Sequence, residues 1–160
     1  MPPPFVYPII STMNDNAFLS LVLSARADSV SAPAKDPRLL SPLCLAYVGD
    51  TLYDLFIRTL LIESTDYAVK TLHTLSAQRV CAKAQAEAFF KVELLLTEEE
   101  LAIFKRGRNS HLGTVPKNAE IGHYRTATGF EALIGYLFLS KQDARLAEMM
   151  KAALSENAHV

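Results

Sequence analysis

The chain has 160 residues, of which 50% are hydrophobic and 21% are charged, and its formal net charge is −1. This composition is ordinary for one globular domain and differs from that of a disordered chain. The balanced charge excludes a polycation that coats nucleic acid over its whole surface, so any such binding must come from a local patch.

Residues 1–37 are rich in Pro, Ser and Ala, and we expect a partly disordered N-terminal arm with one short helical segment near residues 14–25. The stretch MPPPFVYPII has no basic region before its apolar part, so it is a poor signal peptide. A plastid transit segment stays open as an alternative. No apolar run reaches the length that crosses a bilayer, and the expected location is the cytoplasm, without a membrane partner.

Residues 38–160 are predicted to be all-α, because no stretch shows convincing strand alternation. Ser41 and Pro42 form a helix start, with serine as N-cap and proline at the first position. This helix should run to about Ile62. Residues 66–96 contain neither proline nor glycine and predict one long helix, or two helices with a joint near Ser76.

The second half of the chain predicts three further helices. Residues 97–100 read Thr-Glu-Glu-Glu, which is a capping box, and Gly107 is the predicted end of that helix. Residues 108–118 (RNSHLGTVPKN) are predicted to be a loop. Asn118 is the expected cap of a helix over residues 119–139, and Asp143 opens the last helix.

Two cysteines fall inside these apolar helical patterns. Cys44 and Cys81 lack the spacing of a metal site or a redox motif. We therefore expect two buried thiols in a protein from a reducing compartment.

The first core helix carries an unusual pair of residues. The stretch LAYVGDTLYDLF (residues 45–56) has an apolar stripe at three- and four-residue spacing, formed by Leu45, Val48, Leu52, Leu55 and Phe56. Gly49 interrupts it, although glycine costs about 1 kcal/mol relative to alanine inside a helix. Asp50 follows directly, and Asp54 lies on the same face because it is four residues further on.

The helix near the C-terminus repeats this combination in TGFEALIGYLF (residues 128–138). Glu131 lies beside an apolar stripe of Phe130, Ile134, Leu137 and Phe138, with Gly129 and Gly135 as neighbours. Glycines let two helix backbones approach closely, which would bring Asp50 and Glu131 together. Two such carboxylates either share a proton or hold a hard divalent cation such as Mg²⁺. The alternative, two separate acids in water at the edges of their stripes, stays open at this point.

Between Lys105 and Arg125 the chain carries five basic residues against one acid, Glu120, with polar and aromatic residues interleaved. In a chain of net charge −1, this concentration favours contact with an anionic polymer. A solvated loop that balances the acidic residues 98–100 is the alternative.

Three segments taken together resemble Mini-ribonuclease III, the short relative of ribonuclease III that lacks a double-stranded-RNA-binding domain. They are LAYVGDTLYDLFIR, FKRGRNSHLGTVPKN and YRTATGFEALIGYLFL, and the resemblance covers residues 38–155. It implies an all-helical homodimer with a ribonuclease III-like catalytic domain that cuts double-stranded RNA with Mg²⁺. The role it implies is maturation of precursor 23S ribosomal RNA.

The resemblance also assigns residues. Asp50 and Glu131 would be the catalytic, metal-binding acids, and Asp54 would act behind them or be merely solvated. The larger family uses four acids, and Ala46 and Thr128 stand at the other two positions here, as in Mini-ribonuclease III. The residues that would bind RNA are Arg106, Arg108, Asn109, Lys117, Asn118, Tyr124 and Arg125.

Two other functions stay open from sequence. One is a non-catalytic RNA-binding protein derived from ribonuclease III, which the presence of both Asp50 and Glu131 argues against. The other is a helical protein–protein module, for which the basic segment would be dispensable.

Overall fold

The computed structural model describes residues 35–110, 113–114, 117 and 120–155. These residues contain helices and no strand, which confirms the all-α prediction. None of the helices in this part of the chain has the length and apolar character needed to cross a membrane. The N-terminal arm lies outside the described residues up to residue 34. In chain order the helices are η1 (Pro37–Leu39), α2 (Pro42–Ser64), α3 (Val69–Val80), α4 (Ala82–Val92), η2 (Glu93–Leu95), α5 (Glu98–Arg108), α6 (Ile121–Leu139) and α7 (Asp143–Ala153).

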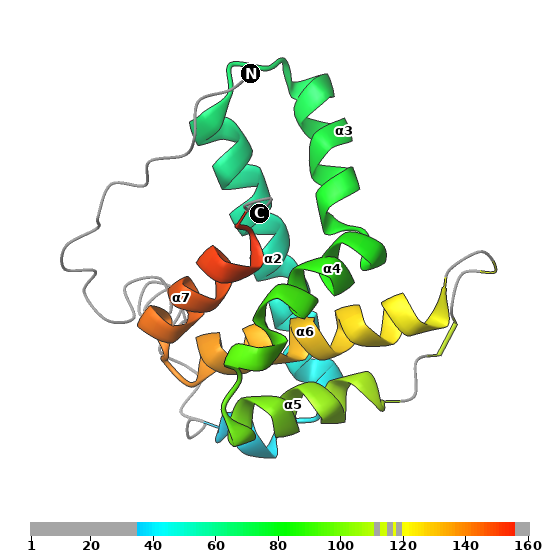
Figure 1. Ribbon diagram of the computed structural model, residues 1–160, viewed down its shortest axis with the longest axis vertical. Helices are drawn as coiled ribbons and strands as arrows, with labels where there is room; N and C mark the ends of the chain where they lie inside the picture. Colours follow the sequence, from blue (N-terminus) through cyan, green and yellow to red (C-terminus); the bar gives the residue numbers. More distant parts are fainter. Residues whose placement is uncertain (1–34, 111–112, 115–116, 118–119, 156–160) are drawn as a thin grey trace, which may run out of the picture.

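Helix α6 is the centre of the core. It crosses the middle of the molecule in Figure 1, and it packs against α2, α4, α5 and α7. The side chains of Phe130, Leu133, Ile134 and Leu137 are fully buried. A helix that is hydrophobic on all sides is stable only when neighbours cover all of it. A charged residue on the buried part of this helix, residues 127–138, therefore has little contact with water.

Helix α2 begins as predicted, but the face that it buries in the core differs slightly from the predicted apolar stripe. Ser41 Oγ accepts a hydrogen bond from the amide of Cys44, and Pro42 is the first helical residue. The buried stripe runs through Leu45, Gly49, Leu52, Tyr53, Ile57 and Leu61. The prediction that Leu55 belongs to it was wrong, because Ile57 takes the core-facing place and Leu55 is 48% exposed.

Glycines set the distance between α2 and α6. A Cβ atom added to Gly49 would overlap the backbone carbonyl of Glu131 and lie 2.9 Å from the amide nitrogen of Gly135. A Cβ atom added to Gly135 would in turn overlap the carbonyl of Leu45. The two backbones therefore touch directly, as the sequence predicted for these two glycines. Gly129 was expected to serve the same crossing, but it contacts Phe104 of α5 instead.

The segment 66–96 forms two helices, and their joint lies at Cys81 rather than near Ser76. Ser76 is inside α3, where its hydroxyl donates to the carbonyl of His73. Cys81 has extended backbone angles (φ −67°, ψ 157°) and ends α3 while it begins α4. No proline or glycine marks this break, so the pattern placed it five residues too early.

Helices α5 and α6 also differ in detail from the prediction. The capping box at Thr97 is present, but α5 continues through Gly107 to Arg108. Gly107 is buried, and a Cβ atom there would lie 2.9 Å from the Cα of Gly129. This glycine therefore permits close packing of α5 on α6 and does not end the helix. Helix α6 starts at Ile121 with Glu120 as its N-cap residue, and the predicted cap, Asn118, lies outside the described residues.

Both cysteines are free and exposed, so the prediction of two buried thiols was wrong. Cys44 lies in the first turn of α2 and Cys81 at the joint of α3 and α4. Both positions are at helix ends, where the apolar pattern around a residue does not ensure that the core covers it.

The crossing of α2 and α6 generates a stability prediction. Gly49→Ala should lower the free energy of unfolding by more than about 3 kcal/mol, because two main chains must separate to admit one methyl group. Gly122→Ala is the matched control, since nothing lies within 4 Å of its added Cβ. The control should be neutral or stabilising by up to about 1 kcal/mol. Chemical denaturation of both variants measures the difference, and equal midpoints would contradict direct backbone contact.

Candidate active site

The crossing of α2 and α6 places the two predicted acids in one hollow. Asp50 follows Gly49 in α2, and Glu131 is the residue of α6 whose carbonyl Gly49 contacts. The hollow has a volume of about 340 Å³ and a mostly polar lining. Its walls come from α2, from the α3–α4 joint and from the first half of α6, with side chains of Asp50, Gln85, Tyr124, Thr128 and Glu131.

The charge of Asp50 acts on the carboxyl group of Glu131. Burial, followed by the charge of Asp50, raises the pKa of Glu131 from 4.5 to about 7, and the nearby amide of Gln85 opposes this shift. The pKa of Asp50 is also raised, first by burial and then by the charge of Asp54. The hollow therefore holds two acids whose ionised forms are disfavoured, and a cation between them would reverse that effect.

The other residues at the family's acid positions are not ionisable. Ala46 is buried in the core. Thr128 is 6% exposed, and its hydroxyl donates to the carbonyl of Tyr124 at 3.0 Å. Asp54 lies one turn beyond Asp50, and the guanidinium Nε of Arg58 donates to both its carboxyl oxygens at 2.8 and 2.9 Å. Asp54 is therefore paired with Arg58, and its charge affects the site by raising the pKa of Asp50.

The predicted RNA-binding residues occupy several different environments. Tyr124 is the one among those described that lines the hollow. Arg108, Asn109, Lys117 and Arg125 are exposed, and Asn118 lies outside the described residues. The guanidinium carbon of Arg108 is 5.8 Å from the centre of the Phe104 ring, and its Nε donates to Asn109.

Arg106 has a structural partner that the sequence did not suggest. Its guanidinium donates to the carbonyls of Arg38 at 3.1 Å and Leu40 at 3.0 Å, on the chain that enters α2. These bonds connect α5 to η1 and the start of α2. Two nitrogens of the Arg106 guanidinium already donate to backbone carbonyls. Only the remaining N–H groups are available to an RNA phosphate.

Comparison with known proteins decides the family. The sequence model of the ribonuclease III domain matches residues 43–142. The Mini-ribonuclease 3 of Clostridium tetani is 46% identical over 122 residues, which span 76% of this chain and 81% of the relative. That of Staphylococcus aureus is 36% identical over 120 residues, spanning 74% of this chain and 90% of the relative. The chain belongs to the ribonuclease III family, in its Mini-ribonuclease 3 branch.

The fold agrees with this assignment. A crystal structure of a protein from Fusobacterium nucleatum has a TM-score of 0.66 to this chain at 32% sequence identity, covering 73% of this chain and 93% of the other. The ribonuclease III family acts on double-stranded RNA and works as a dimer. The chain is accordingly an endoribonuclease of the ribonuclease III type, as its three sequence segments indicated.

The described part of the chain contains no group of three or more His, Cys, Asp or Glu residues arranged for a metal ion. The hollow nevertheless has features that fit a hydrated divalent cation: two carboxyl groups, a hydroxyl and the buried amide of Gln85. Mg²⁺ keeps several water molecules and needs only one or two protein carboxylates. The residues present therefore suit Mg²⁺ better than a cation that requires a complete protein cage.

Gln85 is the site residue that the sequence reasoning missed. It lies in the stretch AKAQAEAFF, which reads as an ordinary amphipathic helix, yet Gln85 is only 2% exposed on the buried face of α4. A polar residue on the apolar face of a helix was the available signal, because buried amides usually have a specific partner.

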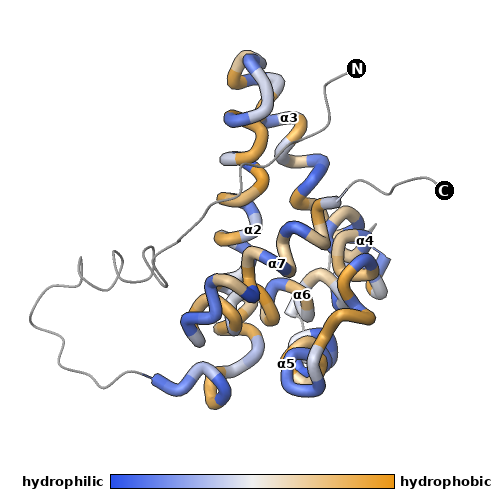
Figure 2. The backbone as a smooth tube through the Cα atoms, turned by 60° about the vertical axis from the view of Figure 1, so that its left-hand side comes forward, coloured by the Kyte–Doolittle hydropathy of each residue, from blue (hydrophilic) through white to orange (hydrophobic). Residues whose placement is uncertain are grey.

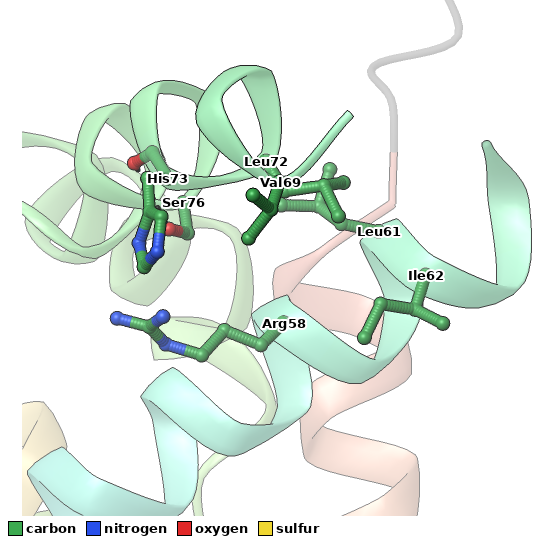
Figure 3. Close-up of a pocket in the computed structure, with 7 residues that line it drawn as sticks. All are labelled: Arg58, Leu61, Ile62, Val69, Leu72, His73 and Ser76. Carbon is green, nitrogen blue, oxygen red and sulfur yellow. Dashed lines mark hydrogen bonds between the residues drawn. The ribbon is translucent and has the colours of Figure 1, made fainter. Parts of the chain in front are cut away.

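A second, smaller hollow lies between α2 and α3 and has a volume of about 110 Å³. Figure 3 shows the guanidinium of Arg58 extending from α2 towards His73 of α3, with Leu61 and Leu72 nearby. Its lining is mostly hydrocarbon, and Arg58 is paired with Asp54. Catalytic chemistry is therefore better supported at the hollow that contains Asp50 and Glu131.

The raised pKa of Glu131 predicts a pH-dependent stability. A folded-state pKa of about 7 against 4.5 means that the folded protein binds this proton more tightly. The stabilising effect is complete below pH 4.5 and is lost as the pH rises to about 7. In metal-free buffer, Glu131→Gln should match wild-type stability near pH 4.5 and exceed it by on the order of 2–3 kcal/mol at pH 8.

Urea unfolding at the two pH values measures this difference. Glu63→Gln, at an exposed position of the same protein, should show no such gain at pH 8. If Glu131→Gln were equally stable relative to wild type at both pH values, the carboxyl of Glu131 would not be desolvated in the folded protein.

Proposed function

We propose that this chain is a Mg²⁺-dependent endoribonuclease whose metal-binding acids are Asp50 and Glu131. The observation that carries the proposal is the position of Glu131, a carboxyl group within the buried part of helix α6, where the charge of Asp50 acts on it. Burial and the nearby charge of Asp50 both raise the pKa of Glu131, so an ionised Glu131 destabilises the fold unless a cation occupies the hollow. This cost favours a catalytic role over a structural one.

The side chains around the hollow would have different roles. Asp50 and Glu131 would hold Mg²⁺, which supplies an activated water and offsets the negative charge of the scissile phosphate and the leaving oxygen. The Tyr124 hydroxyl is available to a phosphate or ribose at the hollow. The buried hydroxyl of Thr128, bonded to a carbonyl of its own helix, keeps its lone pairs for a water molecule.

The exposed basic residues would contact the RNA backbone. Arg108, Lys117 and Arg125 are exposed and free of carboxylate partners in the described residues, and Asn109 accompanies them. Arg106 and Asn118 complete the set inferred from the family resemblance. A-form duplexes are recognised through shape, phosphates and 2′-hydroxyls, so this set should bind duplexes with little sequence preference.

The homodimer is supported by an apolar stripe along α2. Leu43, Tyr47, Leu55 and Ile62 lie on one face of the helix and are 43%, 82%, 48% and 64% exposed. Figure 2 shows hydrophobic residues on α2 over most of its length, including the part that extends beside α3. A two-fold dimer through this stripe would supply two sites for the two antiparallel strands of an RNA duplex.

The substrate we propose is precursor 23S ribosomal RNA, processed in the cytoplasm. The support is the similarity to bacterial Mini-ribonucleases 3 over most of the chain. A non-catalytic RNA-binding protein would have no need of two acids in one hollow, so we do not favour that alternative.

Removal of one acid tests the proposed function. Asp50→Asn keeps the size of the side chain and removes its charge, so cleavage of a duplex RNA in Mg²⁺ should fall at least 100-fold. Binding should persist or tighten, because a negative charge near the phosphates has gone. Gel electrophoresis of the products and a gel shift measure the two effects, with Asp143→Asn in α7 as control. Cleavage within threefold of wild type would remove Asp50 from the site.

The salt dependence of binding tests the basic residues. Arg108→Ala and Lys117→Ala should weaken binding to all duplexes alike, and each should reduce the slope of log K against log salt by about one. Lys151→Ala, on the exposed face of α7, is the charge-matched control and should leave the slope unchanged. Fluorescence anisotropy at several salt concentrations measures the slopes, and identical slopes for all four proteins would place the RNA elsewhere.

A further inference from the structure

The side chain of Gln85 connects the α3–α4 joint to the active-site acid. Its amide Nε2 donates to the carbonyl of Val80 at 3.0 Å, the last residue of α3. The same side chain lines the hollow together with Glu131, and its amide lowers the pKa of that carboxyl group. Because Cys81 breaks the helix, the Val80 carbonyl is one of the helix-end acceptors that need a partner from outside the helix.

The oxygen of the Gln85 amide has no such partner in the described part of the chain. Gln85 Oε1 is buried and has no hydrogen-bond partner in the described part of the chain. The residue is 2% exposed, and it faces a core side of α4 that also carries Ala86, Ala88, Phe89 and Val92. A buried acceptor without a donor is destabilising, so an apolar residue of similar length would suit the packing at this position better.

We propose that Gln85 is a positioning residue of the active site, whose amide is anchored on the Val80 carbonyl and holds the carboxyl group of Glu131 in the hollow beside Asp50. The proposal rests on the proposed role of Glu131 in metal binding. It accounts for an amide that donates to one backbone carbonyl, shares the hollow with one acid and has an oxygen without a hydrogen-bond partner in the described part of the chain. It also relates the position of Glu131 to the joint that forms one wall of the hollow.

This arrangement gives Gln85 a role that neither Thr128 nor Asp54 can take. Thr128 directs its hydroxyl to a carbonyl of α6 itself, and Asp54 is held by Arg58. A residue that orients a metal-binding carboxylate typically contributes 10–100-fold to metal affinity. Gln85 therefore acts through Glu131 and needs no contact with the RNA.

The test replaces Gln85 with methionine, which has a similar length and no hydrogen-bonding amide. Gln78→Met, at an exposed position of α3, is the matched control. In Gln85→Met, Mg²⁺ affinity measured by calorimetry without RNA should fall about tenfold, and the melting temperature of the metal-free protein should stay within about 4 °C of wild type. With a duplex RNA substrate, kcat should fall about tenfold while KM changes less than twofold.

A second measurement needs no metal. In metal-free buffer, the effects of Gln85→Met and Glu131→Gln on the unfolding equilibrium constant should be non-additive by at least twofold, because one change removes the partner of the other. Additive effects would overturn the proposal. Unchanged Mg²⁺ affinity in Gln85→Met, with Asp50→Asn weakened, would also overturn it.

The two proposals fail differently. If Asp50→Asn binds Mg²⁺ as tightly as wild type, the metal-binding acids have been assigned wrongly. The metal-free cycle then decides about Gln85 alone, because it measures the energetic coupling between Gln85 and Glu131. Loss of stability in Gln85→Met without a change in kcat would indicate a purely structural amide and overturn the positioning role.

Discussion

The direct contact between the backbones of α2 and α6 is the constraint on which the rest of the structure depends. Gly49 and Gly135 leave no space for a Cβ atom at the crossing, so each helix lies in the groove of the other. This contact sets Asp50 and Glu131 side by side, although 80 residues separate them in the chain. A wider crossing would separate the two acids and open the hollow to water, and both effects would return the pKa of Glu131 towards its ordinary value.

The sequence predicted the features that follow from local pattern and from residues with one strong physical meaning. A glycine and an acid inside an apolar helix pattern, present twice, indicated the crossing and the acid pair. Ser41, Pro42 and Thr97 marked helix starts correctly, because a cap uses only neighbouring residues. These signals depend on a few consecutive residues, so they survive without knowledge of the tertiary structure.

Features that depend on packing were not predictable in the same way. Gly107 reads as a helix end, but α5 needs it to approach Gly129 of α6. The break at Cys81 has no sequence marker. It leaves the carbonyl of Val80 without a partner in α3, and the side chain of Gln85, five residues further on, donates to this carbonyl. Arg106 reads as a phosphate ligand, while its acceptors belong to residues 38 and 40. In each case the deciding partner comes from another element, which no local pattern reveals.

The charge distribution of the site has a consequence for the order of binding. Two acids in the hollow repel a phosphate, whereas the exposed basic residues between positions 105 and 125 attract the RNA backbone. Under the proposed function, an RNA duplex would bind to the basic residues, while the two acids without a metal would repel the scissile phosphate. A divalent cation held by Asp50 and Glu131, as we propose, would replace that repulsion of the phosphate with attraction. Under the proposed function, metal binding and phosphate placement would be coupled by Coulomb's law, and the partial burial of Glu131 would strengthen this coupling, because charges there are screened less than in water.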